Sequence, residues 1–358
     1  MSVVLTEQVM SNGHTNNGIS YLEQVQQIVQ ANAASVQEER SIQRNFARLM
    51  VERIQKVNEY LFGSEKELMT FGYRQLDNAF GGGVQPGLYL IPGQTNIGKT
   101  AFMTNLALSI AMSNDNATVL YFSLDENELG VIPRLMSCLA GLPIQAVKFP
   151  NRHAAEAGVL QRRAAGYNKL VQLANEGRFA LFGSADGNHT VEWVEDQVLQ
   201  CMSEAKDRQF VVFIDFLHDL LTEKGFDDEQ GRLKHVVQVL MDLSRQYYLP
   251  IFMTAELRKL NKRPGARPHL EDVRETVRII YKMDAVLMLY NEMAMLGHDA
   301  RVYWQQGQEK MPVLEVHIQK TRYGNKHVLF FNFLPEQSRI IEPTDDAIRF
   351  YYDRLKNS

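Results

Sequence analysis

The segment from Gly93 to Thr100 constrains the fold of this chain more than any other part of the sequence. It reads GQTNIGKT and matches the pattern G-x-x-x-x-G-K-[ST] of a phosphate-binding loop. An apolar run at Gly87–Ile91 precedes it and is typical of a short buried strand, while Ala101–Leu108 has the pattern of an amphipathic helix. A strand, a loop bounded by glycines and a helix N-terminus offer backbone N–H groups and a positive helix end to an anion. The sequence therefore predicts a phosphate site.

The residue types in this loop predict how it binds a nucleotide. Lys99 would place a positive charge on the β- and γ-phosphates, and the Thr100 hydroxyl would hold Mg²⁺, so ATP and Mg²⁺ are the expected ligands. The alternative, a glycine-rich turn with an incidental lysine, is disfavoured by the flanking strand and helix. The residues expected to contact the nucleotide are Gly93, Thr95, Asn96, Ile97, Gly98, Lys99, Thr100 and Ala101.

The composition is that of an ordinary globular chain. Its 358 residues are 45% hydrophobic and 22% charged, enough for one large core or for one domain with an appendage. The net charge of −4 excludes a global basic field, so any nucleic-acid binding must come from local patches. Cys138 and Cys201 lack metal-ligand spacing and are expected to be buried free thiols. Because no signal peptide or long uncharged apolar run is found, we expect a soluble, cytoplasmic protein without membrane contact.

Four regions are expected along the chain. Residues 1–20 are rich in Ser, Asn, Gly and Thr and are expected to be disordered. Residues 21–62 contain no Gly or Pro and predict one long helix or two shorter ones with a narrow apolar stripe. This segment either caps its own domain or packs on a neighbouring subunit. Residues 63–343 form the predicted nucleotide-binding domain, and residues 344–358 form a helical tail.

From about Leu68 onward, short apolar runs alternate with helical patterns. This alternation predicts an α/β fold with a mainly parallel central sheet and antiparallel strands added near the end. The expected strands are Leu88–Ile91, Thr118–Phe122, Phe179–Phe182, Phe210–Asp215, Ile251–Thr254, Ala285–Tyr290, Leu314–Gln319 and Val328–Phe333.

Two of these strands end in acidic residues. The final carboxylate of Phe210–Asp215 would emerge beside the phosphate loop and hold Mg²⁺ through water. Asp125 and Glu126 follow another strand, and either could orient the attacking water as a general base. The alternative is that both acids only cap a helix that starts near Asn127.

Basic residues gather at two further positions. The loop after the strand Ile251–Thr254 is either a contact for the nucleic-acid backbone or a solvated surface loop. Lys320 and Arg322 lie in a tight turn between two late strands, where they form either an arginine finger for an adjacent subunit or an ordinary basic hairpin tip. The loop residues expected to contact nucleic acid are Arg258, Lys259, Lys262, Arg263 and Arg267.

Together these motifs resemble the C-terminal motor domain of DnaB-type replicative DNA helicases over roughly residues 65–343. They occur in the order of the family, which makes the set more specific than any single motif. The matching segments are Phe122-Ser123-Leu124 with Ile132-Pro133-Arg134-Leu135, similar to F-S-L-E and its arginine-bearing helix; Phe213–Leu217, similar to I-D-Y-L; Pro250–Leu257, similar to P-V-x-x-x-S-Q-L; Arg267–Val286, similar to R-P-x-x-x-D-L-R-E-S-G-x-I-E-x-D-A-D-x-V; and Lys320-x-Arg322-x-Gly324, similar to K-x-R-x-G.

This resemblance implies a RecA-like fold that assembles into a homo-oligomeric ring, usually a hexamer, with ATP sites between subunits. It implies ATP-driven translocation on single-stranded DNA and unwinding of duplex during replication, with primase or a helicase loader as further partners. By resemblance, Arg322 with Lys320 acts as an arginine finger on the neighbouring subunit's ATP, and residues 21–62 match the linker helix that contacts the next subunit.

Several positions depart from the family pattern and indicate a divergent member. Asp125 replaces the family's catalytic Glu and is one methylene shorter, so either water positioning is slower or Glu126 compensates. Glu256 replaces a Gln that senses the γ-phosphate, and a carboxylate there is repulsive unless it is paired or protonated. The family's N-terminal helical domain, where primase and loader usually bind, is expected to be absent or reduced to about sixty residues. Two alternatives to a helicase stay open: an ATP-dependent assembly or switch protein that does not unwind DNA, and a recombinase-like filament.

Overall fold

The structure of this chain is a computed structural model, in which two compact units can be distinguished, residues 1–67 and residues 68–358. The described residues are 21–62, 68–183, 185–257, 266–273 and 277–356. Among the helices in these ranges, none is both long and apolar enough to cross a lipid bilayer.

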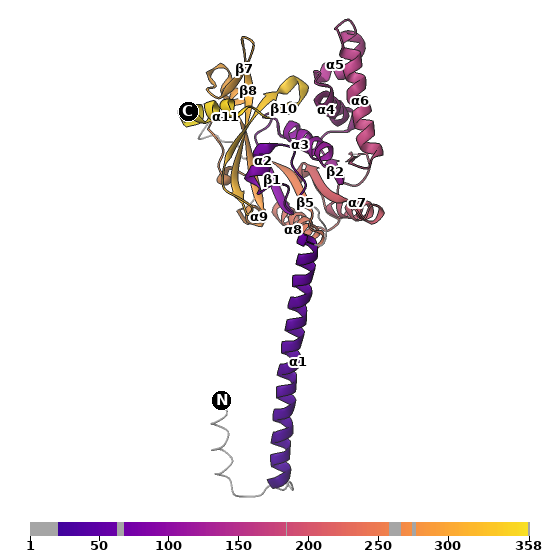
Figure 1. The fold of residues 1–358 in the computed structure, drawn as a ribbon, viewed down its shortest axis with the longest axis vertical. Helices are drawn as coiled ribbons and strands as arrows, with labels where there is room; N and C mark the ends of the chain where they lie inside the picture. The colour runs from indigo at the N-terminus through magenta and orange to yellow at the C-terminus, as the bar shows by residue number, and fades with distance from the viewer. Residues whose placement is uncertain (1–20, 63–67, 184, 258–265, 274–276, 357–358) are drawn as a thin grey trace. The chain divides into compact units, whose positions relative to one another are not determined.

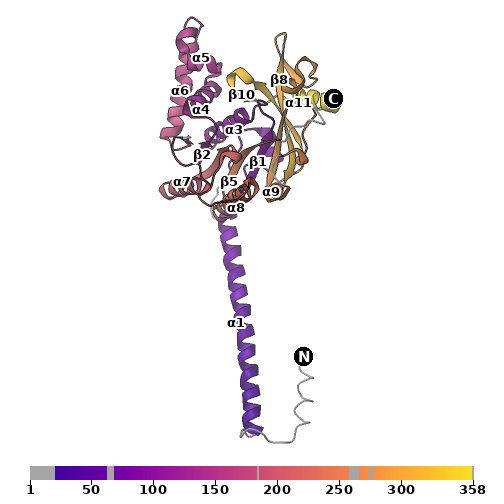
Figure 2. The ribbon, with the colours of Figure 1, turned by 180° about the vertical axis from the view of Figure 1, so that it is seen from behind.

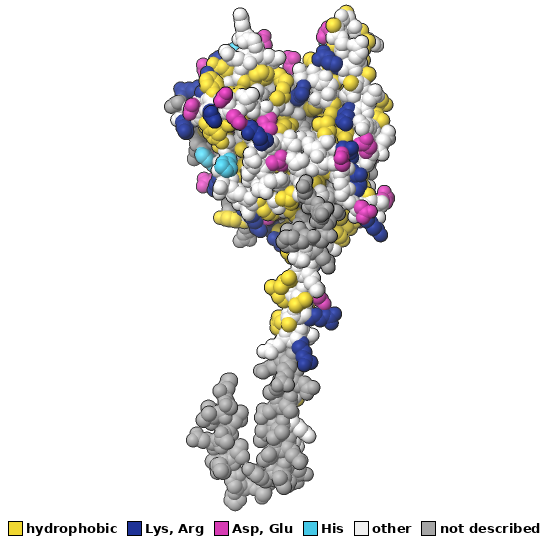
Figure 3. All heavy atoms as spheres, viewed as in Figure 1, with side chains coloured by type: hydrophobic (Ala, Val, Ile, Leu, Met, Phe, Trp, Pro, Cys, Tyr) yellow, Lys and Arg dark blue, Asp and Glu magenta, His cyan; other side chains and the backbone are white. Residues whose placement is uncertain are grey.

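In the first unit, α1 (Tyr21–Phe62) is one continuous helix, which decides between the one long and two shorter helices expected from the sequence. Its apolar stripe is exposed, with Phe46, Met50 and Ile54 between 55% and 67% accessible to solvent. Figure 3 shows hydrophobic side chains on one side of this helix and basic side chains on the other. Burial of such a stripe against another surface is energetically favourable. Packing of α1 on a neighbouring subunit stays a prediction. The segment predicted to be disordered, residues 1–20, lies outside the described residues.

The second unit is built around one sheet with the strand order β10-β9-β8-β6-β1-β5-β4-β2-β3, and β7 pairs with β8. The pairs from β6 through β3 are parallel, and the pairs that involve β7 to β10 are antiparallel. This confirms the predicted α/β fold. The strands are β1 (Gly87–Gly93), β2 (Ala117–Ser123), β3 (Phe179–Phe182), β4 (Gln209–Asp215), β5 (Pro250–Glu256), β6 (Ala285–Asn291), β7 (Tyr303–Gln306), β8 (Glu309–Thr321), β9 (Val328–Leu334) and β10 (Arg339–Ile341).

Helices cover both faces of this sheet. Successive residues of a strand point to opposite faces, so that Tyr89 joins the core beneath α3 while Leu88 and Leu90 join the core beneath α7 and α8. In Figures 1 and 2, α4, α5 and α6 gather at one side of the sheet and the late antiparallel strands at the other. The helices of this unit are α2 (Arg74–Ala79), α3 (Lys99–Ser113), α4 (Glu128–Ala140), α5 (Ile144–Lys148), α6 (Val159–Asn175), α7 (Val191–Glu204), α8 (Glu229–Tyr247), α9 (Val277–Lys282), α10 (Glu292–Leu296) and α11 (Asp345–Lys356).

All eight predicted strands are present, but two further strands and the environment of α3 differ from expectation. The strands β7 and β10 were not predicted, because β7 is short and polar and β10 has only three residues. The helix after the phosphate loop is not amphipathic, since residues 101–111 of α3 are all buried. It packs against the sheet, including β2 and β10, and against α4. The amide of Asn105 is satisfied in this interior by the carbonyl of Ser338 and the N–H of Ile340.

The predicted C-terminal tail is part of the second unit. The Tyr351 side chain of α11 is 2% exposed, packs with Phe330 of β9, and donates a hydrogen bond from its hydroxyl to Asn332 Oδ1 at 2.8 Å. The next turn of the helix is held as well, because Arg354 donates to the carbonyl oxygen of Arg301. The helix was correctly predicted, but it closes one side of the antiparallel strands and is not an appendage.

Replacing Tyr351 by Ala should lower the free energy of unfolding by about 3 kcal/mol, because a large buried ring and its hydrogen bond are lost. Phe350→Ala is the matched control, since this neighbouring side chain is 47% exposed, and it should change stability by less than about 0.5 kcal/mol. Urea titration of both variants measures the difference. Equally small effects would mean that α11 does not unfold with the rest of the unit.

Candidate nucleotide site

The phosphate loop leaves the end of β1 and enters α3 at Lys99. Gly98 has a φ of 111°, in the region that favours glycine, and a Cβ at this position would lie 3.1 Å from the Phe333 ring. A Cβ at Gly93 would lie 2.5 Å from Ile97 Cδ1. A larger residue at either position would therefore crowd a neighbouring side chain, and at Gly98 the positive φ would add backbone strain.

Lys99 lies folded over this loop. Its ammonium group donates hydrogen bonds to the carbonyl oxygens of Gly93 and Gln94 at 3.1 and 3.0 Å. Burial lowers the pKa of Lys99, and the nearby carboxylates of Glu256 and Asp215 oppose that shift. The ammonium is thus held at the mouth of the loop, where a phosphate would replace the carbonyl partners.

The Asp215 carboxylate at the end of β4 is the buried centre of the site. Burial raises its pKa, and hydrogen bonds from the hydroxyls of Thr254, Thr100 and Tyr121 oppose that shift. Thr254 Oγ1 donates to Asp215 Oδ1 at 2.5 Å, and the Tyr121 hydroxyl lies 3.3 Å from Oδ2. The strands β2, β4 and β5 are adjacent in the sheet, so their ends supply these groups together with the start of α3.

These residues fit a magnesium ion of the kind predicted. Thr100 and Asp215 both line the site, and the Thr100 hydroxyl is close enough to oppose the upward shift of the Asp215 pKa. Hydroxyl, carboxylate and water oxygens suit Mg²⁺, which usually keeps several waters and binds through substrate phosphates. Within the described ranges, no group of three or more His, Cys, Asp or Glu side chains could hold a metal ion. A magnesium ion at this site would therefore depend on the nucleotide for part of its coordination.

A pocket of about 330 Å³ joins these groups. Most of the predicted nucleotide and catalytic residues line it, and five further residues were not predicted. The predicted lining residues are Thr95, Asn96, Gly98, Lys99, Thr100, Ala101, Asp125, Glu126, Asp215 and Glu256. The additional ones are Arg134, Phe216, Phe333, Pro335 and Ser338. Arg134 belongs to a segment that matched the family pattern but received no role, while Phe333, Pro335 and Ser338 carry no motif that sequence reasoning could have used.

The two acids after β2 have different environments. Glu126 forms an ion pair with Arg134, in which Nε donates to Oε2 at 2.8 Å and Nη2 donates to Oε1 at 2.5 Å. This hydrogen bonding lowers the pKa of Glu126 below its usual value. The helix α4 begins at Glu128 with Asn127 as its first flanking residue, as predicted. The Glu126 carboxylate is therefore engaged by an arginine and does not serve as a helix cap.

Lys320 and Arg322 lie near the amino-terminal ends of the parallel strands, whereas the phosphate loop lies at their carboxyl-terminal ends. Thr321 pairs with Ala285, and Ala285 pairs with Tyr89 near the start of β1. The loop begins at the other end of this strand, a further four residues or about 13 Å along the sheet. Within one chain, these two cations cannot reach a nucleotide held by the loop.

Both cations have local partners at that edge. Lys320 Nζ donates to the carbonyl oxygens of Ile280 and Tyr281 at 3.0 and 2.8 Å. Arg322 Nε lies 3.3 Å from Asp284 Oδ1, and the Arg322 side chain is half exposed. An arginine in this position has the freedom to meet a second molecule.

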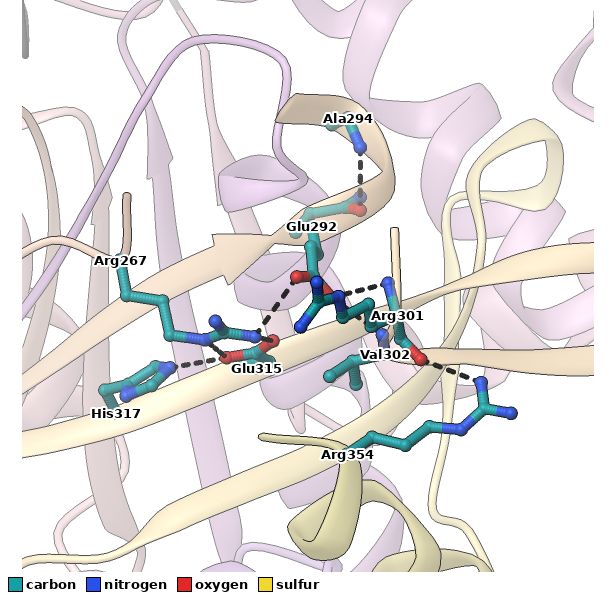
Figure 4. A network of polar contacts seen from close by, with 9 residues as sticks. Arg267, Glu292, Ala294, Arg301, Val302, Glu315, His317 and Arg354 are labelled. Atoms are coloured by element: carbon teal, nitrogen blue, oxygen red, sulfur yellow. Dashed lines mark hydrogen bonds and ion pairs between the residues drawn. The ribbon is translucent and has the colours of Figure 1, made fainter. Parts of the chain in front are cut away.

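The predicted nucleic-acid loop is only partly described. Arg258, Lys259, Lys262 and Arg263 lie outside the described residues. Arg267 is described, and Figure 4 shows its guanidinium turned toward the carboxylates of Glu315 and Glu292. Its Nε and Nη2 each lie 2.8 Å from a Glu315 oxygen, and Nη2 lies 3.7 Å from Glu292 Oε1.

This network gives Arg267 a structural role. Glu315 is fully buried in β8 and also lies 2.7 Å from His317 Nε2. Burial raises the pKa of the Glu315 carboxyl, but hydrogen bonds from His317 and Arg267 outweigh it and hold the pKa below its usual value. An arginine that neutralises a buried carboxylate is poorly placed to contact a phosphate backbone. Arg267, whose side chain is 22% exposed, thus has a structural partner inside the domain, and a nucleic-acid contact by this residue stays a prediction.

Glu315→Ala should lower the free energy of unfolding at pH 7 by about 3–5 kcal/mol, because Arg267 would be left without its buried partner. Glu309→Ala, at the exposed start of the same strand, is the control and should have little effect. The folded pKa of Glu315 lies below its unfolded value of about 4.3, so its contribution is complete at neutral pH and is lost as the pH falls through the folded pKa. The difference between wild type and variant in urea titrations should therefore shrink in acid. A difference that is small at pH 7 would contradict a stabilising network.

Comparison with known proteins gives the family of this chain. The family described as the DnaB-like helicase C terminal domain matches residues 69–342. The replicative DNA helicase DnaB of Helicobacter pylori is 28% identical over 225 residues, which cover 61% of this chain and 43% of that protein. The DnaB of Geobacillus stearothermophilus is 23% identical and covers 75% of this chain and 55% of that protein. The chain thus spans about half the length of these curated relatives.

Solved structures share the fold. One solved structure, described as an ATPase domain, aligns with a TM-score of 0.70 at 19% identity, over 82% of this chain and 99% of that one. A DnaB-like replicative helicase, described with its interactions with primase, aligns with a TM-score of 0.67 at 18% identity, over 95% of this chain and 70% of that one. With the family match extending over most of the second unit, the chain belongs to the DnaB-like helicase C-terminal domain family.

Proposed function

We propose that this protein is an ATP-driven DNA helicase motor, which forms a ring, translocates on single-stranded DNA and unwinds duplex during replication. The observation that carries the proposal is the meeting of Lys99, Thr100 and Asp215 in one pocket at the ends of parallel strands. Family membership and the helicase names of the relatives support it. Binding sites in open α/β sheets lie at such carboxyl edges.

Each residue of the pocket has a role in this proposal. Lys99 and the backbone of residues 93–101 hold the phosphates, while Thr100 and Asp215 hold Mg²⁺, which when bound neutralises charge on the β- and γ-phosphates. Asp125 lines the pocket without the arginine partner that occupies Glu126, so we assign the general base to Asp125. Glu256 faces the same space from β5 as the γ-phosphate sensor.

The arginine finger requires a second copy of the chain. Arg322 and Lys320 lie at the edge of the sheet away from their own phosphate loop, so in the proposed ring they serve the ATP of the adjacent subunit. The remaining basic residues of the loop after β5, namely Arg258, Lys259, Lys262 and Arg263, are the proposed contacts for single-stranded DNA. Primase or a helicase loader is the proposed accessory partner, by family resemblance alone.

One pair of assays tests the proposed function. ATP hydrolysis should be stimulated by single-stranded DNA, and the protein should displace a strand from a forked duplex in the presence of ATP and Mg²⁺. Lys99→Ala, which lacks the loop's charge on the phosphates, should do neither. Hydrolysis without strand displacement would instead identify an assembly or switch ATPase, and open filaments in micrographs would identify a recombinase-like protein.

Asp125→Asn should bind ATP with near wild-type affinity and lose turnover by about 10²–10⁴-fold, the usual effect of removing a general base. The affinity for a fluorescent ATP analogue and the steady-state rate measure the two quantities separately. Turnover within a few-fold of wild type would remove Asp125 from the chemistry.

Arg322→Ala should leave nucleotide affinity nearly intact and cut hydrolysis sharply, by up to about 10³–10⁵-fold for the strongest arginine fingers. Mixing Arg322→Ala subunits with Lys99→Ala subunits should recover part of the activity, because some interfaces in mixed rings then contain an intact loop and an intact finger. Full activity of Arg322→Ala alone would contradict the assignment. No recovery despite confirmed subunit exchange would count against action in trans.

A further inference from the structure

The pocket contains an ion pair whose role the proposed chemistry does not explain. Glu126 and Arg134 both line it, and their side chains are 30% and 29% exposed. The lining includes four carboxylates, on Asp125, Glu126, Asp215 and Glu256, but among the described residues it includes only two cations, on Lys99 and Arg134. A bound triphosphate would add further negative charge to this lining. The orientation of each cation therefore has a large effect on binding.

Arg134 is paired in a way that fixes its orientation. Glu126 accepts from Nε and from Nη2, so the carboxylate lies in the plane of the guanidinium along one of its edges. A guanidinium has five N–H donors, and this pairing engages one on Nε and one on Nη2. The donors on the remaining edge stay free for an acceptor, and rotation about the last bond of the side chain is stopped by the pair.

The position of Glu126 is itself built by the surrounding backbone. Ser123 Oγ donates to the Glu126 carbonyl oxygen at 2.6 Å, which holds the turn between β2 and α4. Gly130 leaves room for the carboxylate, because a Cβ there would lie 3.1 Å from Glu126 Oε2. The backbone of this turn therefore places Glu126, and Gly130 leaves space for the carboxylate that pairs with Arg134.

We propose that Glu126 is a positioning residue for Arg134, which it holds so that the free edge of the guanidinium faces the phosphates of a nucleotide bound at Lys99. This inference rests on the proposed nucleotide site and deepens it. It assigns Glu126 no proton transfer, because both of its oxygens are occupied by Arg134. A neighbouring acid, Asp125, keeps that role.

A double-mutant cycle tests this assignment, with affinity for a fluorescent ATP analogue and kcat/KM as separate readouts. Arg134→Gln should weaken both by about 10- to 100-fold, the range for a charge-assisted hydrogen bond. Glu126→Gln should weaken both by about 3- to 10-fold, since one oxygen and the charge that holds the guanidinium are lost. In the Arg134→Gln background, Glu126→Gln should cause no further loss. Independent, multiplied losses would overturn the proposal, as would a Glu126→Gln defect confined to kcat, which indicates a general base.

Three additional variants sharpen the experiment. Arg134→Lys should show losses of nucleotide affinity and kcat/KM similar to those of Arg134→Gln, because lysine lacks the two parallel donors. Wild-type values for Arg134→Lys would contradict the proposal, because they would mean that only the positive charge matters. Glu126→Asp keeps the charge but is too short to span both nitrogens, so it repeats the test if Glu126→Gln does not fold. Glu128→Gln is the matched control, since that carboxylate lies against Gly183 instead of Arg134. Absence of nucleotide binding by wild type would refute the proposed site. Binding without hydrolysis would refute only the proposed ATPase activity, because the coupling between Glu126 and Arg134 could still be measured from nucleotide affinity.

Discussion

The rest of the site depends on the hydrogen bonds that hydroxyl groups donate to the buried carboxylate of Asp215. Parallel strands place all their carboxyl ends at one edge of a sheet, and here β2, β4 and β5 bring Tyr121, Asp215 and Thr254 together at that edge. Thr100 joins them from the first turn of α3. A buried carboxylate without these donors would be strongly destabilising. The same hydroxyls that make its burial tolerable thus also fix the geometry between the phosphate loop and the acid expected to hold Mg²⁺.

The strand order explains why Arg322 lies far from the phosphate loop of its own chain. The switch from parallel to antiparallel pairing between β6 and β8 returns the chain to the edge where β1 begins. Arg322, which follows β8, therefore lies away from its own phosphate loop, and the proposed action of this arginine on a nucleotide is across a boundary between copies. The exposed stripe of α1, with Phe46 and Met50, is a second feature that has no covering surface among the described residues of its unit. Both features favour function in an oligomer.

The sequence predicted the structure best where local residue types alone determine a feature. The loop motif, the buried strands and the acid at the end of β4 each follow from local requirements, and all eight predicted strands are present. Prediction was weaker where the environment is created by distant segments. The burial of α3 depends on β10 and α4, and the pairing of Arg267 with Glu315 joins residues far apart in the chain. A basic residue beside a flexible-looking loop carries no signal that distinguishes a DNA contact from a partner for a buried carboxylate.

The balance of charge in the pocket connects its chemistry with assembly. Asp125 and Glu256 both depart from the family pattern, and together with Asp215 and Glu126 they outnumber the cations Lys99 and Arg134. Beyond the described lining of the pocket, Mg²⁺ and the cations of a neighbouring copy could supply positive charge to a bound triphosphate. If Arg322 and Lys320 of the adjacent copy complete the site, each interface formed strengthens nucleotide binding, and by thermodynamic reciprocity nucleotide strengthens the interface by the same factor. In the proposed ring, an acidic pocket of this kind would therefore make nucleotide binding more dependent on assembly than a pocket with its own surplus of cations.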